Sequence, residues 1–208
     1  MKAATLSRGE RTRELLLDLA ESAVLEKGYA ATSIEELIAA AGITKSGFFY
    51  HFDGKPALAK ALMQRDNQRT EAAFESIFGM AAARYADPLA ALLDGLVELG
   101  EMAAVSPNAY PGCLAAAFSY QEAQFDDDHH ALMREGFLMR RRQIRKRLDK
   151  VAASASPRVA VGLDDLADMG IAVIQGAIVL ERVRGEPGIL AQQVDLYGAF
   201  IRRLFQPV

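Results

Sequence analysis

The sequence has very little cysteine and no long apolar run, and each absence excludes a class of protein. The single cysteine, Cys113, excludes an intramolecular disulfide and a multi-cysteine zinc site, and it fits a reducing compartment. The longest apolar stretch, 169–180, is too short to span a bilayer. The first residues are charged instead of apolar, so we expect no secretory signal. We therefore expect a cytoplasmic protein with no membrane partner.

The charge balance excludes a protein that coats nucleic acid nonspecifically. The formal net charge is −3, whereas such coating needs a strongly basic surface. Hydrophobic residues make up 51% of the 208 residues, which is enough for a buried core. Helical periodicity recurs along the chain, without strand-like alternation or an internal repeat. The sequence therefore predicts an ordered all-α protein in which any contact with DNA is local.

Two helix starts and a glycine turn lie close together in segment 32–55. Thr32 is followed three residues later by Glu35, the spacing of a capping box, so a helix is expected to begin there. Gly42 tolerates a positive φ and is expected to end that helix. Thr44 is the next N-cap candidate. The pattern predicts two short helices that meet through a tight turn.

A third helix start brackets this segment, at Asp53 with Pro56 in the first turn. The residues of the second short helix divide by periodicity into two faces. Those expected to point inward are Ile43, Phe48 and Phe52, and those expected outside are Lys45, Ser46, Phe49 and Tyr50. In helix-turn-helix proteins the second helix enters the major groove, so the outer face is the candidate for reading DNA.

The same segment resembles the N-terminal domain of the TetR family of transcriptional regulators. That domain follows roughly the pattern GYxxTSxxxIAxxAGxxKGxxYxHFxxKxxL. The residues that carry the resemblance are Gly28, Tyr29, Thr32, Ser33, Ala41, Gly42, Lys45, His51, Phe52, Lys55 and Leu58. The match covers about the first sixty residues. It implies a three-helix DNA-binding domain over 1–55 and a larger helical effector-binding and dimerisation domain over 56–208.

The resemblance also implies which residues contact double-stranded DNA. The expected contacts are Thr32, Ser33, Thr44, Lys45, Ser46, Gly47, Phe49, Tyr50, His51 and Lys55. Phe49 stands where the family usually has a tyrosine that contacts a phosphate, so we expect that contact to move to Tyr50. Ser46 replaces a frequent glycine and adds a hydroxyl. The arginines at 8, 11 and 13 either contact phosphates across the minor groove or form a solvated helix end.

Helical patterns continue to the end of the chain, separated by loops. Helices are expected over 56–85, about 89–99, 113–124, a segment opening at the acidic cluster 126–128, 163–184 and 189–205, with loops at 106–112, 152–158 and 185–188. Gly170, Gly176 and Ala177 would let another helix approach closely. In TetR-like proteins the final helices pair with those of a second subunit, so the resemblance implies a homodimer through 163–184 and 189–205.

Three further groups have both a functional and a structural interpretation. Cys113 would begin a helix whose positive dipole end favours a reactive thiolate, or it is a small buried hydrophobe. Asp126, His129 and His130 could bind a divalent metal, but acidic residues also cap helices, and we predict no metal site. The basic stretch 140–147 suggests a second nucleic-acid surface or a solvated helix end, and we favour the latter.

The function predicted from the sequence is a DNA-binding regulator that a small molecule releases from its operator. Cys113, Phe118 and Phe137 are weak candidates for effector contacts, and an apolar or aromatic effector is a mild preference. The alternatives are a repressor that senses electrophiles through Cys113, or a helical interaction protein without DNA binding. No nucleophile, base and acid combine into a catalytic set, so we expect neither an enzyme nor a cofactor.

Overall fold

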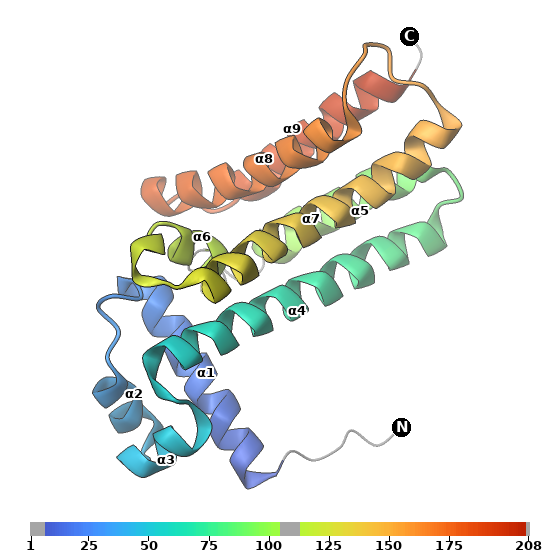
Figure 1. Cartoon of the computed structure of the whole chain (residues 1–208). Helices are drawn as coiled ribbons and strands as arrows, with labels where there is room; N and C mark the ends of the chain where they lie inside the picture. Colours follow the sequence, from blue (N-terminus) through green and yellow to red (C-terminus); the bar gives the residue numbers. More distant parts are fainter. Residues whose placement is uncertain (1–6, 105–112, 207–208) are drawn as a thin grey trace. The chain divides into compact units, whose positions relative to one another are not determined.

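Every regular element in the described part of the chain is helical, which confirms the predicted fold class (Figure 1). The computed structural model describes residues 7–104 and 113–206. The elements in chain order are α1 (Arg8–Lys27), α2 (Ile34–Ala41), α3 (Lys45–His51), α4 (Gly54–Arg84), α5 (Pro88–Ala104), α6 (Leu114–Ser119), the 3-10 helix η1 (Glu122–Gln124), α7 (Asp127–Ser154), α8 (Leu163–Arg184) and α9 (Ile189–Phe205). None of the helices in these ranges has the length and apolar character that crossing a bilayer requires.

The chain forms two compact units, each built from segments that are distant in sequence. The first unit contains the described residues of Met1–Asp66 and Leu114–Arg134. It therefore holds α1, α2, α3, α6, η1 and the first parts of α4 and α7. The second unit contains the described residues of Asn67–Cys113 and Glu135–Val208. The division of functions at residue 55 stays a prediction, while the structural units join α6 to the helix-turn-helix.

Fully buried side chains of α1, α3 and α6 form the core of the first unit. Leu16, Phe48 and Phe118 are 0% exposed. The ring of Tyr29, just after α1, meets Phe118 edge-on at a centroid distance of 5.8 Å and Phe125 at 4.8 Å. Aromatic contacts of this kind add to the apolar area they bury. The suggestion that Phe118 contacts an effector stays a prediction, and its observed place is in this core.

A seam along α9 forms much of the core of the second unit. Its members, each at most 7% exposed, are Leu190, Val194, Tyr197, Ile201 and Leu204. The Tyr197 hydroxyl donates to the carbonyl of Leu166 on α8 over 2.8 Å. Gly170 makes this approach possible, because a Cβ at that position would lie 3.0 Å from the Tyr197 ring. The apolar repeat of the last helix is therefore used inside the chain.

Element boundaries agree with the sequence prediction best at the C-terminal end. The predicted helices 163–184 and 189–205 coincide with α8 and α9, and both glycines between them have positive φ. The predicted helix 113–124 is wrong, because α6 ends at Ser119 and η1 follows. The predicted loop 152–158 begins too early, since α7 continues to Ser154. The predicted loop 106–112 lies outside the described residues.

Candidate nucleic-acid interface

The N-terminus of α2 is capped by Ser33, so the predicted cap at Thr32 is wrong. The Ser33 hydroxyl accepts from the backbone N–H of Glu36 over 3.2 Å. Thr32 is only 3% exposed, and its hydroxyl donates to the carbonyl of Gly28 over 3.0 Å. Thr32 thereby closes the turn between α1 and α2. Of the two hydroxyls, only that of Ser33 is on an exposed residue where a phosphate could reach it.

The turn into α3 has the predicted left-handed glycine and the predicted N-cap residue. Gly42 adopts the left-handed conformation with φ 63°, and its N–H bonds back to the carbonyl of Ala39 over 3.2 Å. Thr44 caps α3, because its hydroxyl accepts from the N–H of Gly47 over 3.1 Å. The Thr44 oxygen also lies 3.0 Å from the hydroxyl of Ser46. Both caps and the left-handed glycine fix where α3 begins and how it is oriented within this unit.

One face of α3 is exposed and carries the candidate reading residues. Phe48 is 0% exposed and Phe52, just after the helix, is 4% exposed, so they hold α3 on the core as predicted. The opposite face consists of the exposed residues Lys45, Ser46, Phe49 and Tyr50. Phe49 is 46% and Tyr50 82% exposed. Their positions four apart along a helix place a cation, two hydroxyls and an apolar ring on one surface.

Lys55 is directed into the unit in this structure, a position that sequence reasoning did not anticipate. Its ammonium donates to the carbonyl of Ala30 over 3.2 Å and lies 4.3 Å from the centre of the Tyr29 ring. Partial burial lowers the pKa of Lys55. His51 is half-buried at the end of α3, with its ring 5.0 Å from that of Tyr50. The predicted DNA contacts of Lys55 and His51 remain predictions.

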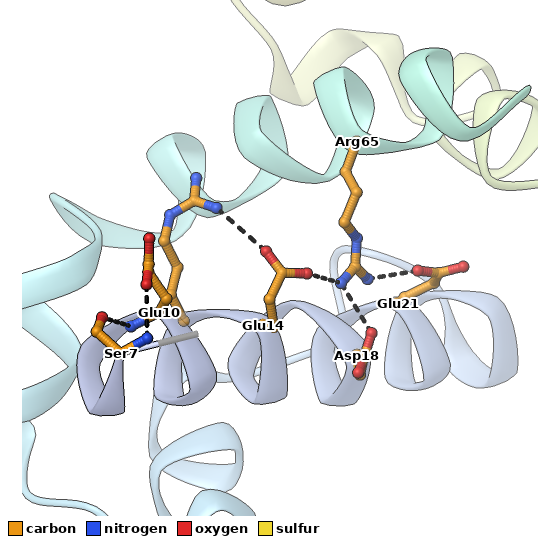
Figure 2. A network of polar contacts seen from close by, with 7 residues as sticks. Ser7, Glu10, Glu14, Asp18, Glu21 and Arg65 are labelled. Carbon is orange, nitrogen blue, oxygen red and sulfur yellow. Dashed lines mark hydrogen bonds and ion pairs between the residues drawn. The ribbon is translucent and has the colours of Figure 1, made fainter. Parts of the chain in front are cut away.

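The first turn of α1 is also capped, a feature that sequence reasoning missed. Ser7 and Glu10 form a reciprocal capping box, with the Ser7 N–H donating to the Glu10 carboxylate over 2.7 Å and the Glu10 N–H donating to the Ser7 hydroxyl over 3.2 Å (Figure 2). Their spacing was a readable signal. Further along, the Arg13 guanidinium lies over the Phe52 ring at 5.2 Å. Contacts of the N-terminal arginines with DNA therefore stay a prediction.

A buried arginine links α4 to α1 within the first unit (Figure 2). Arg65 is 9% exposed and contacts three carboxylates that lie on one face of α1. Its nitrogen atoms are 3.2 Å from Glu14, 2.8 Å from Asp18 and 2.5 Å from Glu21. The spacing of these acids along the sequence was a signal for a shared face, but nothing local identified their partner.

The histidines near the start of α7 do not assemble a metal site. Within the described residues, no group of three or more metal-binding side chains is found. Asp126 instead caps α7, its carboxylate accepting from the N–H of His129 over 3.0 Å. The His129 side chain is 3% exposed and bonded on both ring nitrogens. Cys113 lies just before α6 and is half-buried, so its predicted place inside the first turn is wrong.

The basic stretch of α7 forms ion pairs and hydrogen bonds inside the second unit, and Arg140 in it is buried, which corrects our interpretation for that residue, while Arg142 and Lys146 are exposed. Arg140 is 7% exposed and donates to Asn67 and Thr70 of α4. Arg141 forms a bidentate contact with the carboxylate of Asp168 on α8. The other pairs are Arg142 with Glu135, Arg145 with Asp149 and Asp164, and Lys146 and Arg147 with Glu75. Phe137 lies beside this stretch, 5.8 Å from the Arg140 guanidinium.

A groove in the second unit lies between α5 and α9. Its volume is about 760 Å³, within the range of small-molecule sites. Leu93, Val97 and Val194 are among its apolar lining residues. Asp195 and Arg202 are among its charged ones. Sequence reasoning expected an effector pocket among the middle helices but named none of these residues.

Comparison with known proteins finds a family model that matches the segment with the capped helices. Residues 16–62 match the family model for bacterial regulatory proteins of the tetR family. The chain is 32% identical over 92 residues to the A-factor receptor protein of Streptomyces griseus, covering 44% of this chain and 30% of that protein. It is 27% identical over 129 residues to the transcriptional repressor KstR2 of Rhodococcus jostii (strain RHA1), covering 62% of this chain and 55% of that protein. The chain thus spans between about a third and about half of these two relatives.

The fold is also that of solved regulators. A TetR transcriptional regulator from Chloroflexus aurantiacus J-10-FL superposes with a TM-score of 0.80 at 22% identity, covering 98% of this chain and 100% of that one. At 22% sequence identity, this similarity shows that the two proteins share a fold. The described helices beyond residue 62 therefore share the fold of this solved structure.

Proposed function

We propose that this chain, whose residues 16–62 match the model of the tetR family of bacterial regulatory proteins, is a transcriptional repressor that a small molecule releases from operator DNA. The observation that carries the proposal is the exposed face of α3, held on the core by Phe48 and bounded by the caps at Ser33 and Thr44. A helix presented in this way fits the major groove. The two relatives named above are a receptor and a transcriptional repressor, which supports the ligand-responsive part of the proposal.

On α3, we assign base recognition to Lys45 and phosphate contact to Tyr50. Lys45 is exposed in the first turn, where residues of a recognition helix reach base edges, and lysine pairs with guanine acceptors. Tyr50 presents its hydroxyl from the most exposed aromatic side chain of this helix, at 82%. The neighbouring Phe49 offers no hydroxyl. These assignments keep the predicted shift of the phosphate contact from Phe49 to Tyr50.

A second copy of the chain is the partner we propose for α8 and α9. With the seam of α9 buried inside the chain, these helices still expose large apolar side chains, namely Met169, Val179, Leu180, Val183, Leu196 and Phe200. Gly176 is also open, since a Cβ there would meet nothing within 4 Å. Apolar exposure over two neighbouring helices is typical of a subunit interface. Dimerisation would place two α3 helices on half-sites about one DNA turn apart.

The effector step is proposed for the second unit, with the groove between α5 and α9 as the first place to test. An effector bound there would favour a dimer in which the two α3 helices no longer fit neighbouring half-sites. Replacing Val97, which is 43% exposed and lines the groove, by Trp would fill the space. The Val97→Trp variant should keep operator binding and lose release by the effector. Release at the wild-type effector concentration would move the effector site elsewhere.

The test of the proposed function is binding to double-stranded DNA from the region upstream of the protein's own gene, measured by fluorescence anisotropy at several salt concentrations. Specific affinity should fall steeply with salt, because phosphate contacts release counterions. Lys45→Ala should cost about 1–3 kcal/mol and relax sequence preference. Tyr50→Phe should weaken binding to all sequences alike. Lys150→Ala removes an exposed charge from the second unit and is the matched control.

The alternatives remain distinguishable by the same assay. A helical interaction protein would show no salt-dependent affinity for any DNA. A repressor acting through Cys113 would be released from DNA by an electrophile, and Cys113→Ser would abolish that release. Unchanged release in this variant would remove the thiol from the mechanism.

A further inference from the structure

Two distant side chains hold the backbone of Ala30, in the turn between α1 and α2. The Ala30 N–H donates to the side-chain carbonyl of Gln121, just after α6, over 2.8 Å. The Ala30 carbonyl accepts from the ammonium of Lys55, in the first turn of α4, over 3.2 Å. All three residues belong to the first unit. The turn is therefore held, at its N–H and at its carbonyl, by residues 91 and 25 positions away in the sequence.

The two side chains that bind Ala30 are themselves anchored in the core of the first unit. The Gln121 N–H donates to the carbonyl of Phe118 over 2.9 Å, and Phe118 is fully buried. The Lys55 ammonium lies 4.3 Å from the centre of the Tyr29 ring, which attracts a cation over its face. The Tyr29 ring in turn meets Phe118 edge-on at 5.8 Å. Both hydrogen bonds to Ala30 therefore start from the same buried aromatic cluster.

Gly28 lets the Gln121 side chain come this close to the turn. Its φ is 87°, which side chains with a Cβ rarely adopt. A Cβ at this position would lie 2.7 Å from the side-chain nitrogen of Gln121. The Gly28 carbonyl accepts from the Thr32 hydroxyl over 3.0 Å, and the next residue, Ser33, caps α2. The turn that Gln121 and Lys55 hold thus leads directly into the capped end of α2.

We propose that Lys55 and Gln121 are positioning residues for DNA binding, because together they hold the turn that orients α2 and its Ser33 cap. The inference rests on the proposed function, since it concerns the same DNA-binding unit. The Lys55 ammonium then stabilises the turn and does not contact a phosphate. Without either hydrogen bond the turn populates other conformations, and affinity falls with the fraction of molecules that keep the binding conformation. Segment 114–134, predicted to belong to the effector domain, thereby contributes to DNA binding.

The experiment measures affinity for double-stranded DNA from upstream of the protein's own gene at several salt concentrations. Gln121→Leu removes the acceptor of the Ala30 N–H and should weaken binding about three- to tenfold, the effect of one hydrogen bond. Lys55→Met removes the donor to the Ala30 carbonyl and should have a similar effect. Neither variant should change the salt dependence, whereas loss of a phosphate contact by Lys55 would lower the salt slope by about one. Gln124→Leu, an exposed glutamine three residues after Gln121, is the matched control and should bind like the wild type.

A conservative substitution and a local probe separate positioning from a general loss of the fold. In Gln121→Leu, hydrogen exchange of the Ala30 amide should accelerate, while that of Leu17, buried in α1, should stay unchanged. A merely structural role would accelerate both. Gln121→Glu keeps an oxygen that accepts from the Ala30 N–H. It should therefore retain the slow exchange of the Ala30 amide and bind DNA more tightly than Gln121→Leu.

The outcomes separate this inference from the proposed function. Wild-type affinity in Gln121→Leu, or equal acceleration of the Ala30 and Leu17 amides, overturns the positioning role of Gln121. A smaller salt slope in Lys55→Met overturns that of Lys55 and assigns it a phosphate contact. Each of these results leaves the proposed function intact. Absence of DNA binding by the wild type at every salt concentration overturns the proposed function and this inference together.

Discussion

The two units of the chain use arginine in opposite ways. In the first unit, a single guanidinium, that of Arg65, gathers three carboxylates from one face of α1. In the second unit, basic residues of α7 distribute their contacts over several carboxylates of α4, α8 and α7 itself. Replacing Arg65 removes three ionic contacts of the first unit at once. In the second unit, one ionic contact can be removed while the others stay. The second unit relies instead on close apolar packing along α9.

The largest effect should come from removing the concentrated contact. Arg65→Ala leaves three carboxylates without their shared cation and should lower the free energy of unfolding of the first unit by about 2 kcal/mol. This cost is smaller than that of breaking a fully buried ion pair, because the acids are partly exposed. Hydrogen exchange of α1 and α4 amides would measure it. Lys27→Ala breaks the exposed pair with Glu36 and should cost less than about 1 kcal/mol. Equal losses in the two variants would contradict the indispensable role of Arg65.

Packing should be the sensitive point of the second unit. Gly170→Ala brings a methyl group to 3.0 Å from the Tyr197 ring and should cost about 1–2 kcal/mol in urea unfolding. Gly79→Ala, in α4 of the same unit where an added Cβ would meet nothing within 4 Å, should instead stabilise the chain by about 0.5–1 kcal/mol through helix propensity. If Gly170→Ala is also stabilising, α8 and α9 are less tightly packed than described.

Single ionic pairs of the second unit should matter little. Arg141→Ala breaks the contact with Asp168, whose partners are 38% and 45% exposed, and should cost less than about 1 kcal/mol. The measurement is the urea midpoint at low and at high salt, with Arg65→Ala alongside. A cost for Arg141→Ala as large as that for Arg65→Ala would abolish the distinction between the units.

Acid should affect the first unit more than the second. In the first unit, hydrogen bonds from Ser7, Lys27 and His129 lower the pKa values of Glu10, Glu36 and Asp126, respectively. In the second unit, a hydrogen bond from Lys146 lowers the pKa of Glu75. A lowered folded-state pKa stabilises the fold at neutral pH, and this is lost as pH falls below the ordinary values of 3.8 for Asp and 4.5 for Glu. Exchange protection of α1 and α2 should therefore weaken more than that of α8 and α9 as the pH falls below these values. Equal loss in both units would contradict this.

Local signals in the sequence were sufficient wherever neighbours along the chain decide the structure. Thr44, Gly42 and the alternation of Phe48 with Phe49 and Tyr50 are set by caps and helical periodicity, and the structure confirms each. The last two helices were predicted to the residue because glycines with positive φ interrupt them. The cap at Thr32 was wrong since Thr32 and Ser33 both fit the local pattern. Burial of Thr32 against Gly28 decided between them.

What the sequence could not supply was the pairing of distant segments. Nothing near Arg140 shows that Asn67 and Thr70 will bind it, so a buried residue was taken for a solvated one. The inward position of Lys55 likewise depends on a contact with the Tyr29 ring, 26 positions earlier in the chain. The sequence pattern of α3 did not predict this contact. The partners of Arg65 lie on another helix. Each of these contacts requires the tertiary fold before it can be recognised.

The contribution of α6 to the first unit limits how this protein can be recombined with others. Gln121, just after α6, accepts from the N–H of Ala30 over 2.8 Å, and its amide lies where a Cβ at Gly28 would be. A chimera that transplants only the N-terminal helices onto another scaffold would leave this turn uncovered and would lack Phe118 in the core of the unit. A graft that retargets DNA specificity should therefore carry residues 114–134 as well, or confine its exchanges to the outer face of α3.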